Sequence, residues 1–400
     1  MKVLLLTQVL PYPPDAGPKI KTFNLLRHLA TRHEVSLLSF VRSAAEADLA
    51  RHLQPYCRQI QTVPLHRSAA SDLRHLAHSL LSGQPFVVAR DQSPAMQAAL
   101  WRLTREETFD IVHADQLNMA QFALPLAGPR RVLDQHNAVW TVVQRLWAQE
   151  PVGPRRLVLR WEWQKLRRYE GDICPAFDAV VTVSREDRRA LESVLAGPVP
   201  MYVIPIGIDT REVQPVKRNA DASAIITIGT LFWPPNVDGI VWFAREVWPK
   251  IKRQRPDARF LVVGSRPAPS LVRLGKEDPA IQVTGYVADT APLIRDSALL
   301  IVPLRAGGGM RVKILNAMAQ GLPIVSTTLG YEGIEAVPGR DLLVGDTPGE
   351  LAAAVLSVLA DLELGRRLGA QGRRLVEERY DWRTVCPAID RVYADVMRPA

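Results

Sequence analysis

The chain has 400 residues, of which 47% are hydrophobic and 23% charged, so it is too long for one compact core and predicts a globular protein of two domains. A formal net charge of +9 favours anionic partners such as nucleotides or lipid headgroups, although arginines spread along the whole chain explain the charge without any such partner. The three cysteines have no metal-ligand spacing and argue against a disulfide framework, so we expect a reducing, cytoplasmic compartment.

The first half of the chain alternates predicted strands and helices. Residues 3–6 predict a buried strand rather than a signal peptide or a membrane span, because Gln8 and three prolines interrupt the apolar run. A helix with one apolar face follows over residues 20–29. Such alternation indicates a parallel sheet covered on both faces. Further strands are predicted at 35–40, 109–113, 131–134, 179–183 and 202–204, and helices at 71–81 and 94–105.

Residues 138–172 interrupt this alternation with two predicted helices on either side of the segment 150–154. The second helix carries six arginine and lysine residues, with Trp161 and Trp163 among them. This pattern is typical of helices that rest on an anionic membrane surface. A solvated helix whose tryptophans pack into the domain explains the pattern more simply. A peripheral contact with the inner face of the membrane is therefore a secondary expectation.

The polar segment 206–222 predicts a linker, after which the alternation restarts. Asn236 is predicted to cap the helix after the first strand of this half. We expect an α/β fold of two doubly wound domains facing each other across a cleft, with ligand-binding loops at the carboxyl ends of the strands. The expected boundaries are 1–205 for the N-terminal domain, 206–222 for the linker, 223–380 for the C-terminal domain, and 381–400 for a last helix that could cross back to the N-terminal domain.

A glycine loop between a buried strand and a helix is the most informative stretch, LLIVPLRAGGGMRVKILNAMAQGLPIVSTT at 299–328. Three consecutive glycines, Gly307, Gly308 and Gly309, allow a backbone to approach a ligand closely. The positive end of the following helix suits an anion, and Arg311 and Lys313 add charge beside it. The spacing matches neither a Walker A loop nor GxGxxG. The loop by itself fits a phosphate site or a plain tight turn.

Several further segments carry a resemblance to a known family. In the second half they are IGTLFWPPNVDGIVWF (228–243), FLVVGSRP (260–267), VTGYVAD (283–289), the run 302–334, and DLLVGDTPGELAAAV (341–355). In the first half they are the run 10–40, VLDQHN (132–137), VVTVSREDR (180–188) and VIPIGID (203–209). In this order they resemble glycosyltransferase family 4, the group 1 retaining transferases of GT-B fold, over nearly the whole chain.

The resemblance implies transfer of a sugar from a UDP- or GDP-linked donor to a saccharide or lipid-linked acceptor for a surface polysaccharide. It implies retention of the anomeric configuration, no metal ion and no cofactor, since the nucleotide sugar is a substrate. Arg311 and Lys313 would stabilise the leaving diphosphate. The donor would further contact Gly229, Thr230, Tyr286, Val287, Gly307, Gly308, Gly309, Met310 and Asn316. The acceptor would contact Gly17, Pro18, Lys19 and Asn137, with Asp115 and His136 as catalytic candidates.

The chain departs from the family pattern at three places. The family's paired glutamates are replaced by Gly308 and Asn316, and Asp115 stands where a histidine is common. The basic residues usual after the first strand of the second domain are absent at 232–236. A nucleotide-sugar-binding protein without activity is therefore the alternative, and a nucleotide-sugar epimerase is less favoured because the loops have few carboxylates. No aromatic and basic platform supports nucleic-acid binding.

Overall fold

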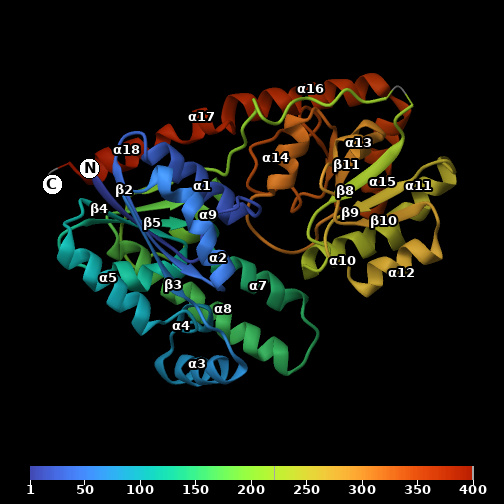
Figure 1. Cartoon of the computed structure of the whole chain (residues 1–400). Helices are drawn as coiled ribbons and strands as arrows, with labels where there is room; N and C mark the ends of the chain where they lie inside the picture. Colours follow the sequence, from blue (N-terminus) through green and yellow to red (C-terminus); the bar gives the residue numbers. More distant parts are fainter. Residues whose placement is uncertain (220, 399–400) are drawn as a thin grey trace. The chain divides into compact units, whose positions relative to one another are not determined.

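The computed structural model describes residues 1–219 and 221–398, which form two compact units (Figure 1). Unit 1 comprises Met1–Ile206 together with the C-terminal segment that begins at Val385. Unit 2 begins at Gly207 and ends at Thr384. Residues after Gly207 pair with unit 2, because the Val216 amide donates to the Gln320 carbonyl at 2.9 Å and the Asn219 amide to the Arg295 carbonyl at 2.8 Å.

Unit 1 is built on a seven-stranded sheet in the order β3-β2-β1-β4-β5-β6-β7, in which every neighbouring pair is parallel. The strand order reverses direction at β1 and β4, as in a doubly wound sheet. Strands β1 and β6 are nearly continuous apolar runs, as expected where both faces of a strand are covered, whereas β4 and β5 also carry buried polar side chains. The strands are β1 (Lys2–Thr7), β2 (Glu34–Val41), β3 (Gln59–Pro64), β4 (Ile111–Asp115), β5 (Arg130–Gln135), β6 (Ala179–Thr182) and β7 (Met201–Val203).

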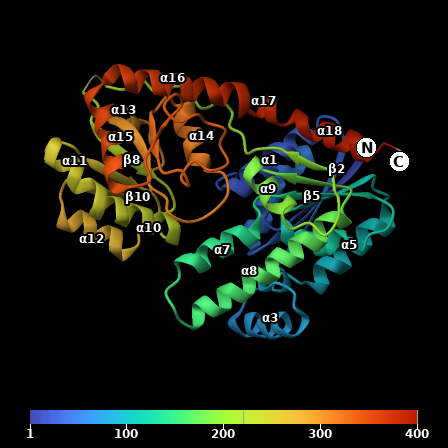
Figure 2. The same ribbon diagram turned by 180° about the vertical axis from the view of Figure 1, so that it is seen from behind.

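Helices cover this sheet on both sides (Figures 1 and 2). Helix α5, for example, places Met96, Leu100 and Leu103 at helical spacing in the core. The α-helices are α1 (Gly17–Leu29), α2 (Ala44–Asp48), α3 (Ala69–Ser82), α4 (Phe86–Ala89), α5 (Pro94–Glu106), α6 (Ala120–Ala123), α7 (Val139–Gln149), α8 (Pro154–Ile173), α9 (Arg185–Glu192) and α18 (Pro387–Val396). The 3-10 helices are η1 (Leu49–Tyr56), η2 (Leu117–Met119) and η3 (Cys174–Ala176).

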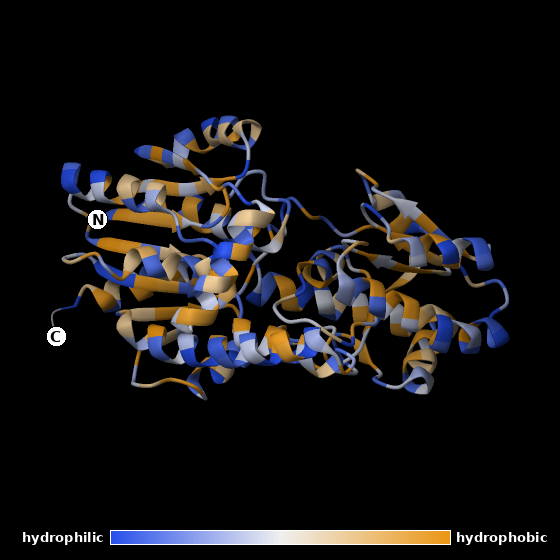
Figure 3. Cartoon of the chain, turned by 90° about the horizontal axis from the view of Figure 1, so that it is seen from below, coloured by the Kyte–Doolittle hydropathy of each residue, from blue (hydrophilic) through white to orange (hydrophobic). Residues whose placement is uncertain are grey.

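Unit 2 repeats the architecture with a six-stranded parallel sheet in the order β10-β9-β8-β11-β12-β13. Its core includes Phe243, Phe260 and Val355, and its strand order reverses at β8 and β11. The strands are β8 (Ala224–Ile228), β9 (Phe260–Val263), β10 (Ile281–Gly285), β11 (Ser297–Val302), β12 (Ile324–Ser326) and β13 (Leu343–Val344). Strands in Figure 3 are largely hydrophobic in colour, whereas helices alternate between the two colours. The predicted doubly wound α/β architecture is confirmed.

The helices of unit 2 lie between these strands in the chain. They are α10 (Pro234–Trp242), the π-helix η4 (Phe243–Val247), α11 (Trp248–Gln254), α12 (Pro269–Glu277), α13 (Ala291–Arg295), α14 (Val312–Ala319), α15 (Pro348–Ala360) and α16 (Leu362–Arg379). Helix α17 (Trp382–Val385) occurs where the chain leaves unit 2. No described helix is both long enough and apolar enough to cross a bilayer.

Two local predictions were wrong. Asn236 does not cap α10, because the helix already begins at Pro234 after Trp233, and prolines are favoured in the first helical turn. The Asn236 amide donates to the Thr230 carbonyl at 3.0 Å instead. The single last helix is two helices, α17 and α18, and Cys386 lies between them.

Candidate active site

The glycine loop of unit 2 lies at the point where the strand order reverses. Gly229 follows the end of β8, and the loop 303–311 follows the end of the neighbouring strand β11. Ligands of doubly wound sheets bind beyond the carboxyl ends of such a strand pair. The fold therefore brings together two predicted donor segments that are about 80 residues apart in the chain.

Arg311 fixes the conformation of the glycine loop. Its Nη1 donates to the carbonyl oxygens of Gly308 and Gly309. Gly307 and Gly309 have φ angles of 102° and 78°, which side chains rarely adopt. A β-carbon on Gly307 would also lie 3.4 Å from Arg311 Nη2 and 3.6 Å from the Pro235 ring. The sequence predicted both the glycines and the charge, but not that the guanidinium holds the loop itself.

Lys313 lies in the first turn of α14 and is half-buried. A β-carbon on Gly229 would lie 3.6 Å from its Nζ and 3.3 Å from Asn236 Nδ2, so the glycine keeps space beside the ammonium. Burial, helped by the charge of Arg311, lowers the pKa of Lys313 to about 7. Within residues 1–219 and 221–398, no carboxylate pairs with Lys313. Two neighbouring basic residues at a helix N-terminus are an arrangement that can bind an anion.

The remaining residues predicted to bind the donor differ in burial and in their distance along the sheet from the glycine loop. Met310 is buried within the loop, and the Asn316 amide donates to the Val312 carbonyl of its own helix at 3.1 Å. Thr230 is exposed after β8. Tyr286 and Val287 follow β10, two strands away from β8, and Tyr286 is 77% exposed.

Arg305 does not belong to the cation pair. Its guanidinium forms a salt bridge with Asp238, with Nη2 2.6 Å from Oδ1, and lies over the Trp242 ring. Its charge is therefore balanced locally, which distinguishes it from Lys313.

Unit 1 has a buried polar cluster at its own reversal point, beyond β1 and β4. Asp115 ends β4, and His136 follows β5. His136 Nε2 lies 2.9 Å from Asp115 Oδ1, and both side chains are almost fully buried. Gln116, next to Asp115, has a φ of 74°, a strained conformation that is common next to functional groups. The structure thus brings together the two predicted catalytic candidates of this unit.

Three further members of the cluster were missed by sequence reasoning. Lys21 Nζ lies 2.5 Å from Asp134 Oδ1, and Thr22 Oγ1 donates to Asp115 Oδ1 at 3.0 Å. Burial alone would raise the pKa of the Asp134 carboxyl, but Lys21 and the neighbouring histidines hold this pKa well below its usual range. The available signal for Lys21 was its spacing of four and eight residues from Leu25 and Leu29, with which it shares the buried face of α1.

The predicted acceptor residues lie next to this cluster in the chain. Gly17, Pro18 and Lys19 form the first turn of α1, and the Pro18 carbonyl accepts a hydrogen bond from Thr22 Oγ1 at 2.9 Å. Asn137 follows His136 in the loop before α7 and is half-buried. Thr22 Oγ1, within hydrogen-bond distance of both the Pro18 carbonyl and Asp115 Oδ1, therefore connects the start of α1 to the buried cluster.

Asp115, Asp134 and His136 have ligand atoms within 4.8 Å of one another, an arrangement that could hold a cation. The Lys21 ammonium already supplies a positive charge there, because it contacts Asp134 directly.

Comparison with known proteins identifies the family. A family model described as Glycosyl transferases group 1 matches residues 222–361, and one described as Glycosyltransferase Family 4 matches residues 21–212. The chain belongs to the family 4, group 1 glycosyltransferases. The family assignment supports an enzyme that uses nucleotide-sugar donors.

Individual relatives of this glycosyltransferase are distant. A 44.6 kDa uncharacterized protein from the cps region of Klebsiella pneumoniae is 20% identical and covers 97% of this chain and 98% of its own. The MMP alpha-(1->4)-mannosyltransferase of Mycolicibacterium hassiacum is 25% identical over 82% of this chain and 80% of its own. The structure of Anabaena HepE in complex with UDP and glucose has a TM-score of 0.69 at 16% identity, covering 99% of this chain and 100% of HepE. This last similarity confirms the GT-B fold.

Proposed function

We propose that this glycosyltransferase moves a sugar from a UDP- or GDP-sugar to a saccharide or lipid-linked acceptor, with retention of configuration and without a metal ion. The observation that carries the proposal is the pair of cations, Arg311 and Lys313, at the glycine loop. Among the described residues Lys313 has no carboxylate partner, and a diphosphate would supply that negative charge.

The donor side of the reaction follows from this charge. The bond between the anomeric carbon and the diphosphate oxygen breaks, and negative charge develops on the diphosphate. Arg311, Lys313 and the amides of Gly308 and Gly309 would stabilise this charge before and during bond breaking. Asn316 would hydrogen-bond the ribose with its amide, in place of the family's glutamate.

On the acceptor side, the new bond forms between an acceptor oxygen and the anomeric carbon. The acceptor hydroxyl loses its proton to the departing diphosphate oxygen, which balances the charges of the step. We propose that His136, oriented by Asp115, contacts the reacting sugars, and that Gly17, Pro18, Lys19 and Asn137 hold the acceptor. The four groups that bind the acceptor would then come from the start of α1 and the loop before α7.

The test is a calorimetric titration with UDP, GDP and ADP in the presence of EDTA. We expect selective binding of UDP or GDP, and expect Arg311→Ala and Lys313→Ala each to weaken it by about 1.5–3 kcal/mol, the range for a charge-assisted hydrogen bond. Lys276→Ala on the exposed face of α12 is the matched control and should bind normally.

Two results would contradict the proposal. Unchanged nucleotide affinity in both Arg311→Ala and Lys313→Ala would show that the diphosphate does not bind at the glycine loop. Normal binding of a nucleotide sugar without transfer or hydrolysis, across a series of acceptors, would indicate a binding protein that has lost activity.

A further inference from the structure

Helix α3 in unit 1 exposes its apolar face to solvent. The apolar residues of an amphipathic helix normally face the core, but those of α3 point outward. Leu73 is 68% exposed and Leu81 is 90% exposed, and Leu76 and Leu80 are exposed as well. These residues recur at helical spacing and form one apolar stripe.

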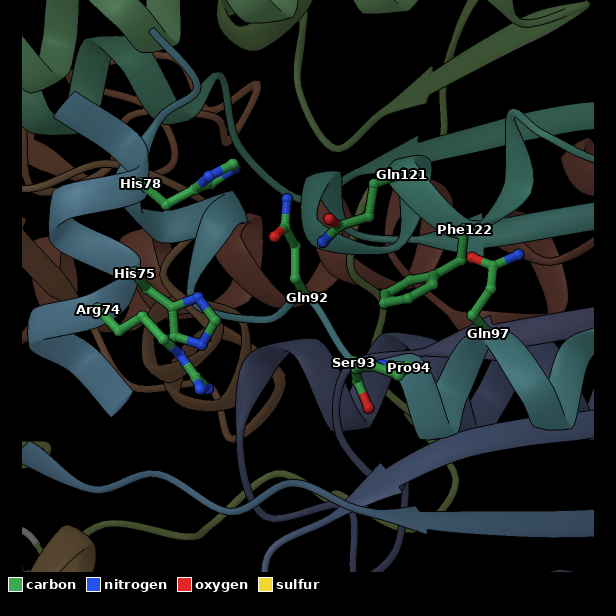
Figure 4. Close-up of a pocket in the computed structure, with 9 residues that line it drawn as sticks. All are labelled: Arg74, His75, His78, Gln92, Ser93, Pro94, Gln97, Gln121 and Phe122. Atoms are coloured by element: carbon green, nitrogen blue, oxygen red, sulfur yellow. The ribbon is translucent and has the colours of Figure 1, made fainter. Parts of the chain in front are cut away.

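The polar side of α3 faces the protein instead. Ser79 is fully buried and donates to the Gln84 carbonyl at 2.7 Å. The same side lines a cavity of about 600 Å³ between α3 and the start of α5 (Figure 4). Residues that line it from α3 are Arg74, His75 and His78. On this side Ser79 Oγ also lies 2.5 Å from Lys165 Nζ of α8, and turning the leucines of α3 inward would break this contact.

A second exposed apolar stripe lies on the first half of α8. Leu157 is 68% exposed, and Val158 and Trp161 are also exposed. The two helices are linked, since Lys165 of α8 lies under the Trp161 ring and its Nζ lies 2.5 Å from Ser79 Oγ of α3. Figures 1 and 2, seen from opposite sides, both show α3 and the first half of α8 at the same end of unit 1.

The positive charge beside the apolar stripes indicates which class of partner binds this surface. Arg155 and Arg160 are exposed beside this stripe, and Arg168 is exposed about two turns further along α8. Arg155 Nε lies 3.5 Å from Glu150 Oε1 and Arg168 Nε lies 3.8 Å from Asp172 Oδ2, whereas Arg160 has no such contact in the described residues, and no acidic residue occurs in 151–161. An apolar protein interface would not need these exposed arginines. A bilayer with anionic headgroups, in contrast, offers both an apolar layer and negative charge. Monomeric proteins rarely leave apolar surface of this kind uncovered.

We propose that the surface formed by α3 and the first half of α8, here called the two-helix surface, docks on a bilayer containing anionic lipids. Leu73, Leu80, Leu81, Leu157 and Trp161 would enter the boundary between headgroups and acyl chains. The arginines of α8 would contact the headgroups. The inference stands independently of the transfer reaction, because it uses none of the residues of the proposed donor and acceptor sites.

The experiment is co-sedimentation of the full chain with phosphatidylcholine vesicles, with and without phosphatidylglycerol, at low and high salt. We expect binding only to vesicles that contain phosphatidylglycerol, and weaker binding at high salt. The triple variant R155E/R160E/R168E should lose binding by more than about tenfold, because each arginine near an anionic surface contributes severalfold to the affinity. The variant L73S/L80S/L81S should bind at least about fivefold more weakly, since it removes inserted apolar area.

The matched control is R366E/R367E/R374E, which makes the same change in net charge on exposed positions of α16 in unit 2. It should bind like the unmodified chain. Equal loss in this control, or no binding of the unmodified chain to either kind of vesicle, would overturn the proposal. A change of oligomeric state in the leucine variant, with vesicle binding unaltered, would instead assign the stripe to contacts between protein chains.

Discussion

Lys313 is a half-buried lysine whose charged neighbour is another cation, Arg311. Its pKa of about 7 means that a large part of the ammonium is neutral in the free protein at pH 8. A bound diphosphate favours the charged form and raises this pKa again. In the proposed function, binding of the diphosphate would therefore restore the positive charge of Lys313.

We therefore predict that nucleotide-sugar binding takes up a proton near pH 8 and that affinity falls as the pH rises above about 7. A nucleotide sugar is used as the ligand in this measurement because its two phosphates do not titrate in this pH range, so that any proton uptake belongs to the protein. Proton uptake is measured by calorimetry in buffers of different ionisation enthalpy.

Lys313→Arg is the control for this prediction, since it keeps the charge and cannot lose its proton. It should bind without proton uptake and with little dependence on pH. Equal uptake in this variant would assign the titrating group to another residue.

At the scale of single elements, Glu170 of α8 determines where α7 begins. The two oxygens of its carboxyl group accept the amides of Val139 at 2.9 Å and Trp140 at 2.7 Å, the first two residues of α7. Asp187 accepts the amide of Ala138 at 2.8 Å. Two carboxyl groups from other helices therefore fix the loop that carries His136, in place of a capping side chain in the loop itself.

Burial raises the pKa of Glu170 to about 8, although the two amides oppose this shift. Between its ordinary value of 4.5 and about 8, the unfolded chain loses this proton and the folded chain keeps it. The free energy of unfolding should therefore fall as the pH rises through this window and level off above it.

Glu170→Gln should remove this dependence, so that its melting temperature relative to the unmodified chain rises between pH 5 and pH 8.5. Scanning calorimetry at several pH values measures the difference. Glu192→Gln, at an exposed carboxylate paired with Arg188, is the control and should show no such trend. A constant offset for Glu170→Gln would contradict the assigned pKa.

Particular elements show what the sequence could predict. Strand β11 was predictable because a continuous apolar run with a glycine loop after it has few other structures available. Strand β3 was not, since Gln59 and Gln61 give it no apolar signal and it is recognised only by pairing with β2. β13 has only two residues and was likewise missed. The glycine loop was predictable from one short stretch of sequence. The contact between Lys21 and Asp134 was not, because these residues are 113 positions apart in the chain and only the folded sheet brings them together.

At the scale of the whole molecule, the last helix is part of the first unit. The Tyr393 hydroxyl of α18 lies 3.0 Å from His113 Nδ1, and His113 Nε2 lies 3.6 Å from Asp134 Oδ2. All three side chains are buried. Helix α18 thus reaches the polar cluster of unit 1 through one hydrogen bond.

Tyr393→Phe should lower the free energy of unfolding by about 1–3 kcal/mol, because it leaves a buried imidazole nitrogen without its partner. Denaturant titration measures this change. Hydrogen exchange should also accelerate in β4 and β5, which carry His113 and Asp134.

Tyr202→Phe is the matched control, since it removes another hydroxyl contact to α18, the bond to Asp395 at 2.9 Å, but does not touch the cluster. Exchange in β4 and β5 should stay normal there. Acceleration in both variants would mean that loose docking of α18, rather than the contact with His113, causes the effect.

The return of α18 to unit 1 has a consequence for biosynthesis. Residues 207–386, a stretch of 180 residues, are translated after the first part of unit 1 and before α18. At roughly 5–20 residues per second, the ribosome needs about 9–36 s for this stretch. During that time the nascent sheet of unit 1 has no Tyr393 for His113 and nothing to cover the surface on which Ile389 and Val392 will pack. The first unit to emerge is therefore the last to be completed, and this interval is when a chaperone would be needed.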